Sequence, residues 1–234
     1  MASDSTTVAL LSDIHSETDA LAAVERALNR QGIERVWCLG DSVDWLLPRE
    51  PLLRGDTTAL RRVRELCEQV LIGNHEAELL AAPFGVDFLR AQPQGDELAA
   101  WLGSLGPLKE LPGEIVLVHG SLTGPTWSFV ETADDAQASF ARSDARLIVC
   151  GHTHLPFLAS CGADGAVEVH RLPAFGAEQL LSSERRWLVN PGSVGRAPLE
   201  GMASWAALRL DEDGRPIAVS WQVTGFERTL HLPG

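Results

Sequence analysis

Seven side chains with oxygen or nitrogen donors recur in short polar groups along the chain. They are two aspartates, one asparagine and four histidines: Asp13, His15, Asp41, Asn74, His119, His152 and His154. With one carboxylate bridging and water bound, this set approaches what two adjacent transition-metal ions need. The residue types and their order therefore predict a centre for two divalent metal ions.

Taken singly, the groups are weak signals. Asp13 and His15 are two residues apart, so an extended backbone would turn both side chains toward the same ion. Gly40-Asp41 alone is typical of a turn, although the two oxygens of Asp41 could bridge ions about 3.5–4 Å apart. His119 alone is typical of a buried core histidine, and His152 with His154 would also suit a mononuclear zinc site or a histidine-bearing surface.

Together the groups are a much stronger signal. Five of the seven histidines, all except His170 and His231, lie in these groups or beside them, close to glycines and just after apolar runs. Histidines placed at random in an acidic chain would rarely gather in this way. The joint pattern therefore favours metal binding over the separate structural interpretations.

The elements that must position these groups alternate between strand and helix. Apolar runs predict strands at 8–12, 36–39, 70–72, 115–118 and 147–150, and apolar spacing predicts helices at 18–31 and 57–69. Each polar group follows the carboxyl end of a strand, which is the edge where open α/β sheets bind ligands. After residue 154 the pattern predicts antiparallel strands at 157–160, 166–171, 205–210 and 217–223, with turns at 164–165 and 213–214.

The stretch 77–112 has a different pattern. It is mostly helical but is interrupted by prolines and glycines, and it lies between two of the polar groups. Two interpretations are open: two helices packed on the sheet, or a partial helical lid over the substrate.

Composition limits the class of protein. The chain has 234 residues, 45% of them hydrophobic and 22% charged, which suits a single domain spanning 1–234. The net charge of −13 disfavours nonspecific binding to anionic membranes or long nucleic acids. Arg54, Arg61, Arg62 and Arg64 are one candidate for a local basic patch.

Cysteine usage and the N-terminus predict a cytoplasmic protein. The four cysteines form no Cys-x-x-Cys pair and no disulfide framework. Residues 1–7 are short and polar, unlike a signal peptide, and no apolar run has the length of a membrane span.

The ordered set Asp-x-His, Gly-Asp-x-x-Asp, Gly-Asn-His-Glu, a lone His-Gly and Gly-His-Thr-His resembles the calcineurin-like metallophosphoesterase superfamily. The later Asn-Pro-Gly-Ser-Val-Gly at 190–195 is similar to its small, single-domain bacterial and archaeal branch. The resemblance implies an α/β fold that is a four-layer αββα sandwich, with two mixed β-sheets flanked by helices.

The resemblance also implies roles for the polar residues. The first metal would be held by Asp13, His15, Asp41 and His154. The second would be held by Asp41, Asn74, His119 and His152, with Asp41 shared. His75 would lie beside the scissile bond and protonate the leaving oxygen or stabilise the transition state, and Asp44 would orient His75.

The expected activity is hydrolysis of phosphodiester or phosphomonoester bonds in small, including nucleotide-like, substrates. A metal-bridging hydroxide would attack phosphorus while the ions neutralise charge on the phosphoryl oxygens. Manganese is the metal expected first, and Fe, Zn, Ni or Co also suit oxygen and imidazole ligands without thiolates.

One departure from the superfamily's protein serine/threonine phosphatases concerns position 45. Those enzymes carry an arginine there that clamps phosphate, whereas this chain has Trp45, which cannot replace it. Trp45 is expected in the core or rim, with stacking on a substrate ring as the alternative. Arg196 is a candidate contact to the substrate phosphate, and 190–195 is expected either to support the site or to face the ligand.

Three alternatives to a small-molecule phosphoesterase are open. A noncatalytic metal-binding scaffold for protein–protein interaction would not need His75, which this chain keeps. A protein serine/threonine phosphatase is disfavoured by Trp45, and a nuclease is disfavoured by the acidic charge. The sequence predicts no oligomeric state.

Overall fold

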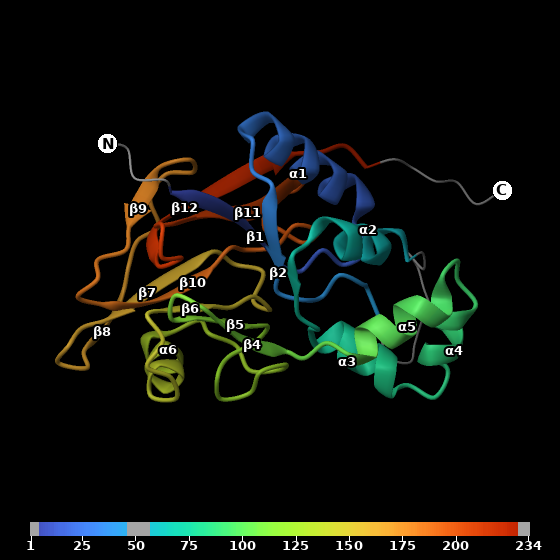
Figure 1. Cartoon of the computed structure of the whole chain (residues 1–234), viewed down its shortest axis with the longest axis horizontal. Helices are drawn as coiled ribbons and strands as arrows, with labels where there is room; N and C mark the ends of the chain where they lie inside the picture. The colour runs from blue at the N-terminus through green and yellow to red at the C-terminus, as the bar shows by residue number, and fades with distance from the viewer. Residues whose placement is uncertain (1–4, 46–56, 229–234) are drawn as a thin grey trace.

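The chain folds around two β-sheets that lie face to face (Figure 1). The computed structural model describes residues 5–45 and 57–228. Within these residues each sheet has six strands. Each sheet is mixed, because three neighbouring strands run parallel and the others are antiparallel.

The first sheet has the strand order β3-β2-β1-β11-β12-β9. Its strands are β1 (Thr6–Leu11), β2 (Arg35–Cys38), β3 (Gln69–Val70), β9 (Glu178–Leu180), β11 (Met202–Leu210) and β12 (Pro216–Gly225). Strands β1, β2 and β3 are parallel, and β1 then pairs with β11 in the antiparallel sense.

The second sheet has the order β4-β5-β6-β10-β7-β8. Its strands are β4 (Leu108–Leu111), β5 (Ile115–Val118), β6 (Leu147–Val149), β7 (Phe157–Cys161), β8 (Val167–Val169) and β10 (Arg186–Asn190). Here β5, β6 and β10 are the parallel strands. The five groups of predicted ligands and the loop at 190–195 lie at the carboxyl ends of the six parallel strands, three from each sheet.

The hydrophobic core has three parts, one between the two sheets and one on the outer face of each sheet. Between the sheets, alternate residues of both pack together, including Leu10, Leu117, Val189 and Trp221. Helices α1 (Thr18–Gln31) and α2 (Thr58–Leu66) cover the outer face of the first sheet, and α6 (Ala133–Phe140) covers that of the second. Helix, sheet, sheet and helix therefore stack as the predicted four-layer α/β fold, which is confirmed.

The stretch 77–112 contains three short helices and a strand. The helices are α3 (Asn74–Ala81), α4 (Gly85–Arg90) and α5 (Gly95–Gly103). They form a separate hydrophobic cluster with Val43, Trp45 and Leu60, beside the sheets at the right of Figure 1. The interpretation as two helices packed on the sheet is wrong, because these helices bury their apolar side chains mainly against one another and because 108–111 pairs with β5.

Several short elements differ from the sequence pattern. The strand expected at 70–72 is only Gln69–Val70, and the helix expected at 57–69 ends at Leu66. Strands β4, β9 and β10 and helix α6 were not predicted. None of the helices among the described residues is both long and apolar enough to cross a membrane.

Candidate metal centre

The predicted ligands converge where the parallel strands of the two sheets end. Three groups of residues could each hold a metal ion, because within each group the ligating atoms all lie within 4.8 Å of one another. The groups are Asp13 with His15 and His154, His15 with Asp41 and His75, and Asp41 with His119 and His152. Residues that are far apart in the sequence therefore share one small volume. Asp41 belongs to two of the groups, as a bridging carboxylate would.

One half of the centre is built from the ends of β1 and β6. The Nε2 atoms of His15 and His154 face each other at 3.0 Å, and the Asp13 Oδ1 atom lies 3.4 Å from that of His154. Asp13 is fully buried, and its Oδ1 atom has no hydrogen-bond partner among the described residues. Buried charges are normally paired or bound to metal, so two facing imidazoles beside an unpartnered carboxylate oxygen fit a cation.

The other half is built from the ends of β2, β3 and β5. The Nε2 atom of His119 lies 3.1 Å from the Asn74 side-chain oxygen and 3.5 Å from Asp41 Oδ2. The His119 Nδ1 atom lies 2.9 Å from the carbonyl oxygen of Leu39. A proton on Nδ1 donated to that carbonyl leaves Nε2 as the ligand, which is the usual way a protein fixes the tautomer of a metal-binding histidine.

His152 completes this half with the same type of support. Its Nε2 atom lies 3.3 Å from the carbonyl oxygen of Trp127, and donation to that oxygen leaves Nδ1 to act as a ligand. The His152 backbone N–H donates to Asp13 Oδ2 at 3.0 Å. The two halves of the centre are thus tied together through Asp13.

The backbone at the ligands is left-handed. Asp13, His15, Asp41, His152 and His154 all have φ between 49° and 68°. Non-glycine residues rarely adopt this conformation, and each such residue costs on the order of 1–3 kcal/mol. The expectation that Asp13 and His15 converge through an extended backbone is therefore wrong; a left-handed turn, tied to Gly40, Asp41 and Ser42 by backbone hydrogen bonds, brings them together.

Glu76 holds the group around Asp41 in place. Its buried carboxylate accepts N–H bonds from Asp41 and Gly73 at 2.8 Å and from Val43 at 2.9 Å. The N-terminus of α3 adds a fourth bond, because the His75 N–H donates to Asp41 Oδ1 at 2.9 Å. A Cβ at Gly73 would lie 2.1 Å from that same oxygen, so only glycine lets Asp41 approach the helix this closely.

The loop at 190–195 holds two of the ligand-bearing segments in place through hydrogen bonds. The Asn190 side-chain amide donates to the Gly151 carbonyl at 2.8 Å, and the Ser193 hydroxyl donates to the Asp13 carbonyl at 2.8 Å. Both residues are fully buried. Of the two roles left open for this group, the structure favours support of the ligand-bearing loops.

Charges in the centre keep most ligands ready to bind a cation. Burial lowers the pKa of His15 to about 3 and also lowers that of His152, so both are neutral. For Asp13 and Asp41, burial raises the pKa but the surrounding histidines outweigh it, and both pKa values are lowered.

Two other groups have raised pKa values. Burial lowers the pKa of His119, but the charge and hydrogen bond of Asp41 outweigh it and raise the value to about 9. Burial raises the pKa of Glu76 to about 7, against the opposing effect of its backbone donors. Both shifts follow from several ionisable groups sharing a site with little water.

His75 lies at the edge of the centre and has a defined orientation. Its Nδ1 atom accepts the Trp45 N–H at 2.9 Å, and its Nε2 atom lies 4.0 Å from Asp41 Oδ2. The neutral ring therefore carries its proton on Nε2, the atom that faces the centre. Asp44 Oδ1 lies 3.7 Å from His75 Nδ1, which already accepts the Trp45 N–H, so Asp44 accepts no hydrogen bond from that atom, and its predicted role in orienting His75 stays a prediction.

Asp44 instead pairs with Arg196. The guanidinium Nη2 of Arg196 donates to Asp44 Oδ1, and the Arg196 side chain is 38% exposed. The backbone N–H of Arg196 donates to the Ser193 hydroxyl at 2.7 Å. Arg196 is thus a positive charge close to the candidate ligands, where it affects His15, on a loop that is fixed by the same serine that supports Asp13.

The Trp45 side chain lies in the hydrophobic core. Its side chain is 4% exposed and packs against Phe84 and Phe88 in the α3–α5 cluster. Stacking of a substrate ring on Trp45 is therefore contradicted by its burial, and the core position is the one that the structure shows. The contribution of Trp45 to the site is its backbone N–H, which fixes His75.

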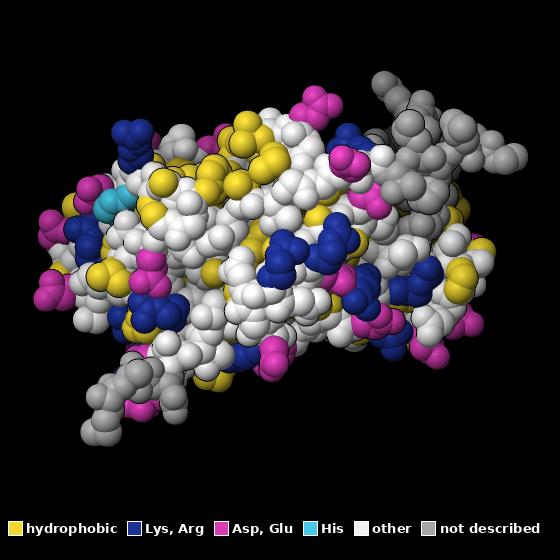
Figure 2. Space-filling view, turned by 90° about the horizontal axis from the view of Figure 1, so that it is seen from above, with side chains coloured by type: hydrophobic (Ala, Val, Ile, Leu, Met, Phe, Trp, Pro, Cys, Tyr) yellow, Lys and Arg dark blue, Asp and Glu magenta, His cyan; other side chains and the backbone are white. Residues whose placement is uncertain are grey.

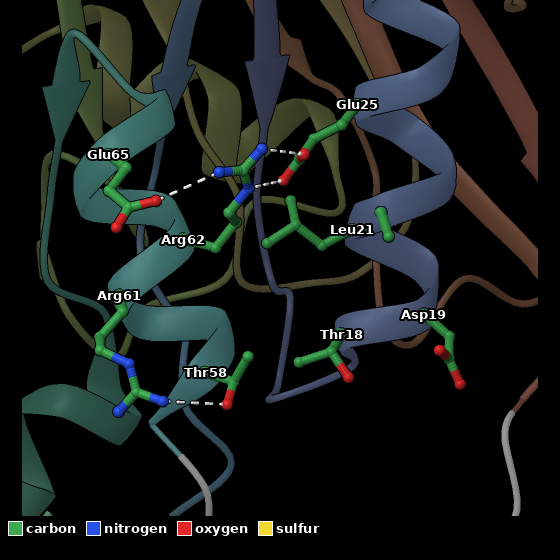
Figure 3. Close-up of a pocket in the computed structure, with 9 residues that line it drawn as sticks. Thr18, Asp19, Leu21, Glu25, Thr58, Arg61, Arg62 and Glu65 are labelled. Atoms are coloured by element: carbon green, nitrogen blue, oxygen red, sulfur yellow. Dashed lines mark hydrogen bonds and ion pairs between the residues drawn. The ribbon is translucent and has the colours of Figure 1, made fainter. Parts of the chain in front are cut away.

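Two described arginines of the basic patch are already paired with carboxylates. Arg62 bonds to Glu25 and Glu65, and Arg64 pairs with Glu97, while Arg54 lies outside the described residues. Arg61 and Arg62 line a cleft of about 390 Å³ between α1 and α2 (Figure 3), which contains none of the predicted ligands. On the face shown in Figure 2, basic and acidic side chains are interspersed.

Two supports of the site carried no strong signal in the sequence. Glu76 was visible only as the last residue of Gly-Asn-His-Glu, and two of its three backbone partners, Asp41 and Val43, lie more than 30 positions away after another strand. The Trp127 carbonyl is a backbone group, so no residue type could have revealed it. Long-range backbone contacts of this kind become visible only with the fold.

Known proteins are similar to this chain in fold or in sequence. A metallophosphoesterase from Sphaerobacter thermophilus has a crystal structure that matches with a TM-score of 0.72 and 26% identity, over 95% of this chain and 89% of that one. An uncharacterised protein of Methanocaldococcus jannaschii is 28% identical over 222 residues, 88% of this chain and 82% of its own length. A symmetrical bis(5'-nucleosyl)-tetraphosphatase of Citrobacter koseri is 31% identical over 140 residues, 54% of this chain and 46% of that enzyme.

The fold and the site define an α/β protein with two mixed β-sheets and a candidate metal centre lined by histidines and carboxylates. The family model for the calcineurin-like phosphoesterase superfamily domain matches residues 7–213. The chain belongs to the calcineurin-like phosphoesterase superfamily.

Proposed function

We propose that this protein is a metal-dependent phosphoesterase with two divalent cations, acting on small phosphate esters in the cytoplasm. The observation that carries the proposal is the convergence of three ligand groups, two of which share Asp41 and one of which contains His75. Asp13, His15, Asp41 and His154 would hold one cation. Asp41, Asn74, His119 and His152 would hold the other.

The bound cations would supply Lewis acidity, lowering the pKa of a water molecule and drawing charge from the phosphoryl oxygens. Ligands made of carboxylate, amide and imidazole without thiolate suit manganese first, and Fe, Zn, Ni or Co as well. The raised pKa of His119 and the unpartnered Asp13 oxygen both support a site that is completed by positive charge.

The chain's own residues would handle the proton and the phosphate. His75 carries an Nε2 proton directed at the centre and would donate it to the leaving oxygen, a step that contributes typically about 10²–10⁴-fold to rate. Arg196 is partly exposed beside the centre and would exchange its bond with Asp44 for one to a phosphate oxygen. Arginine suits this role because its planar donors match phosphate geometry.

We infer that the substrate is nucleotide-like. The relative from Citrobacter koseri is a tetraphosphatase that acts on bis-nucleosyl compounds, and the net charge of −13 disfavours long nucleic acids. Trp45 stands where protein serine/threonine phosphatases carry their phosphate-clamping arginine, and its burial disfavours that activity further.

The test combines metal analysis with hydrolysis. Protein loaded with Mn²⁺ is expected to contain about two metal ions per chain, as a two-metal site requires, and to hydrolyse bis(p-nitrophenyl) phosphate or p-nitrophenyl phosphate. Failure to bind metal would overturn the proposal. Two bound metals without hydrolysis of either ester would favour the noncatalytic scaffold for protein–protein interaction, which is the second candidate function.

A further inference from the structure

An exposed aromatic pair borders the candidate metal centre. Trp127 is 53% exposed and Phe129 is 52% exposed, on the segment between β5 and α6. Single exposed apolar residues are common on protein surfaces. Two large aromatic side chains two residues apart, beside a predicted metal ligand, are typical of a binding surface.

His152 is contacted by the Phe129 side chain and by the Trp127 backbone. The Phe129 ring stacks on the His152 imidazole, with centroids 4.4 Å apart and planes 7° from parallel. The Trp127 carbonyl oxygen lies 3.3 Å from the Nε2 atom of the same imidazole. One face of Phe129 is therefore covered by a ring that belongs to the metal centre, while half of its surface stays open to solvent.

The segment that carries the pair is held in place. The Gly120 N–H donates to the Pro125 carbonyl at 2.7 Å, and the Ser128 N–H donates to the Gly124 carbonyl at 3.0 Å. Val130 is buried in the cluster under α6. Because backbone hydrogen bonds hold residues 120–128 and the Val130 side chain is buried, the two aromatic residues are presented without the ordering cost of a free loop.

We propose that Trp127 and Phe129 form a platform on which the base of a nucleotide substrate stacks while its phosphate occupies the metal centre. This rests on the proposed function for the position of the phosphate. The base is the occupant that fits, because it is planar and apolar on its faces and is joined to the phosphate by a short sugar. Base–aromatic stacking tolerates any base, so the platform selects for nucleotides without selecting among them.

The test compares AMP with ribose 5-phosphate, which carries a hydroxyl in place of the base. Calorimetric titration uses Mn²⁺-loaded His75→Ala protein, so that turnover does not interfere. AMP is expected to bind about 5- to 100-fold more tightly, as stacking of one base allows. Trp127→Ala and Phe129→Leu should each reduce that ratio toward one and leave the affinity for ribose 5-phosphate unchanged.

A matched control is Phe175→Ala, which removes an equally exposed aromatic residue between β8 and β9. These strands lie at the left of Figure 1, opposite α3, so the ratio should stay as in the parent. Phe129→Leu keeps an apolar cover on His152, and metal content of each variant checks that the centre is intact.

The outcomes separate the two proposals. Equal affinity of the parent for AMP and ribose 5-phosphate overturns the platform, even if chromogenic esters are hydrolysed. A preference for AMP that survives both platform variants also overturns it. A base-dependent preference in a protein that hydrolyses no ester would support the platform and contradict the phosphoesterase proposal.

Discussion

At the scale of single residues, the centre depends as much on groups that orient ligands as on the ligands themselves. His75 is held by the Trp45 backbone rather than by a carboxylate. His119 and His152 are each directed by a carbonyl oxygen. Backbone partners do not change charge with pH, so the orientation of these rings should be maintained across a wide pH range.

Substitution of His75 by alanine should lower the rate without removing metal. His75 is placed to donate a proton rather than to complete either ligand set, so kcat should fall by roughly 10²–10⁴-fold. Metal content by elemental analysis and kcat by ester hydrolysis provide the check. Loss of metal in parallel with loss of rate would mean that His75 is a ligand.

Substitution of Glu76 by glutamine should destabilise the metal-free protein. The two carboxylate oxygens accept three backbone N–H groups, and an amide NH₂ cannot replace either oxygen as an acceptor. Leaving a buried donor unpaired costs about 1–3 kcal/mol. Denaturation at pH 8, above the Glu76 pKa of about 7, measures the loss.

The control for this experiment is Glu78→Gln, on the same helix. Glu78 is only partly buried, and such surface substitutions usually stay within about 0.5 kcal/mol. An equal loss from both variants would show that Glu76 acts through general helix effects instead of through its contacts with Asp41 and Gly73.

At the scale of elements, the sequence predicts best where an apolar strand ends in a polar donor. The strands that lead to Asp13, Asp41 and His119 have clear apolar runs, and their carboxyl ends meet as expected. Strand β10 ends at Asn190 in the same way but was not predicted, because Arg186 opens it and only three apolar residues follow before Asn190.

Other features of the site follow from tertiary contacts that no local pattern contains. Left-handed backbone is expected at glycine, yet here it occurs at aspartate and histidine. The spacing of Asp13 and His15 suggested an extended segment because alternation is the simplest way to align two side chains. Hydrogen bonds to residues 40–42 impose the turn instead.

The loop at 190–195 gives a test at this scale. A Cβ at Gly195 would lie 1.9 Å from the Ile14 carbonyl oxygen and 3.0 Å from the Glu17 Cβ. Gly195→Ala should therefore push this loop away from the Asp13 group and lower stability by about 1–3 kcal/mol, as overpacking does. Unfolding free energy and metal content should fall together.

Gly103→Ala is the matched control. Gly103 is the last residue of α5 and a Cβ there meets nothing within 4 Å. Alanine is the better helix former, so this change should be neutral or slightly stabilising. A comparable loss in both variants would contradict the close packing assigned to Gly195.

At the scale of the whole molecule, metal binding is coupled to protons. Without a cation, His119 has a pKa of about 9 and is protonated at neutral pH, whereas His15 and His152 are neutral and both aspartates are charged. Ligands must lose their protons before they bind metal. One proton per chain should therefore leave when the second half of the centre is filled.

The sign of the pH dependence follows from that proton. Below about pH 9 a cation competes with a proton on His119, so apparent affinity should rise by up to about tenfold per pH unit and then level off. Calorimetry in two buffers with different ionisation enthalpies counts the protons released. An affinity that does not change between pH 6 and 8 would contradict the raised pKa of His119.

The left-handed backbone at the metal-ligating residues should lower the stability of the metal-free protein while placing the side chains that bind the cations. At most positions alanine stabilises a protein relative to glycine, but at φ 62° the order should reverse. His154→Gly should therefore exceed His154→Ala in unfolding free energy by about 1 kcal/mol in the metal-free protein. If so, part of the free energy of cation binding offsets the conformational cost of holding five residues in a backbone region that their side chains disfavour. The metal-free protein would then be more stable without these ligating side chains.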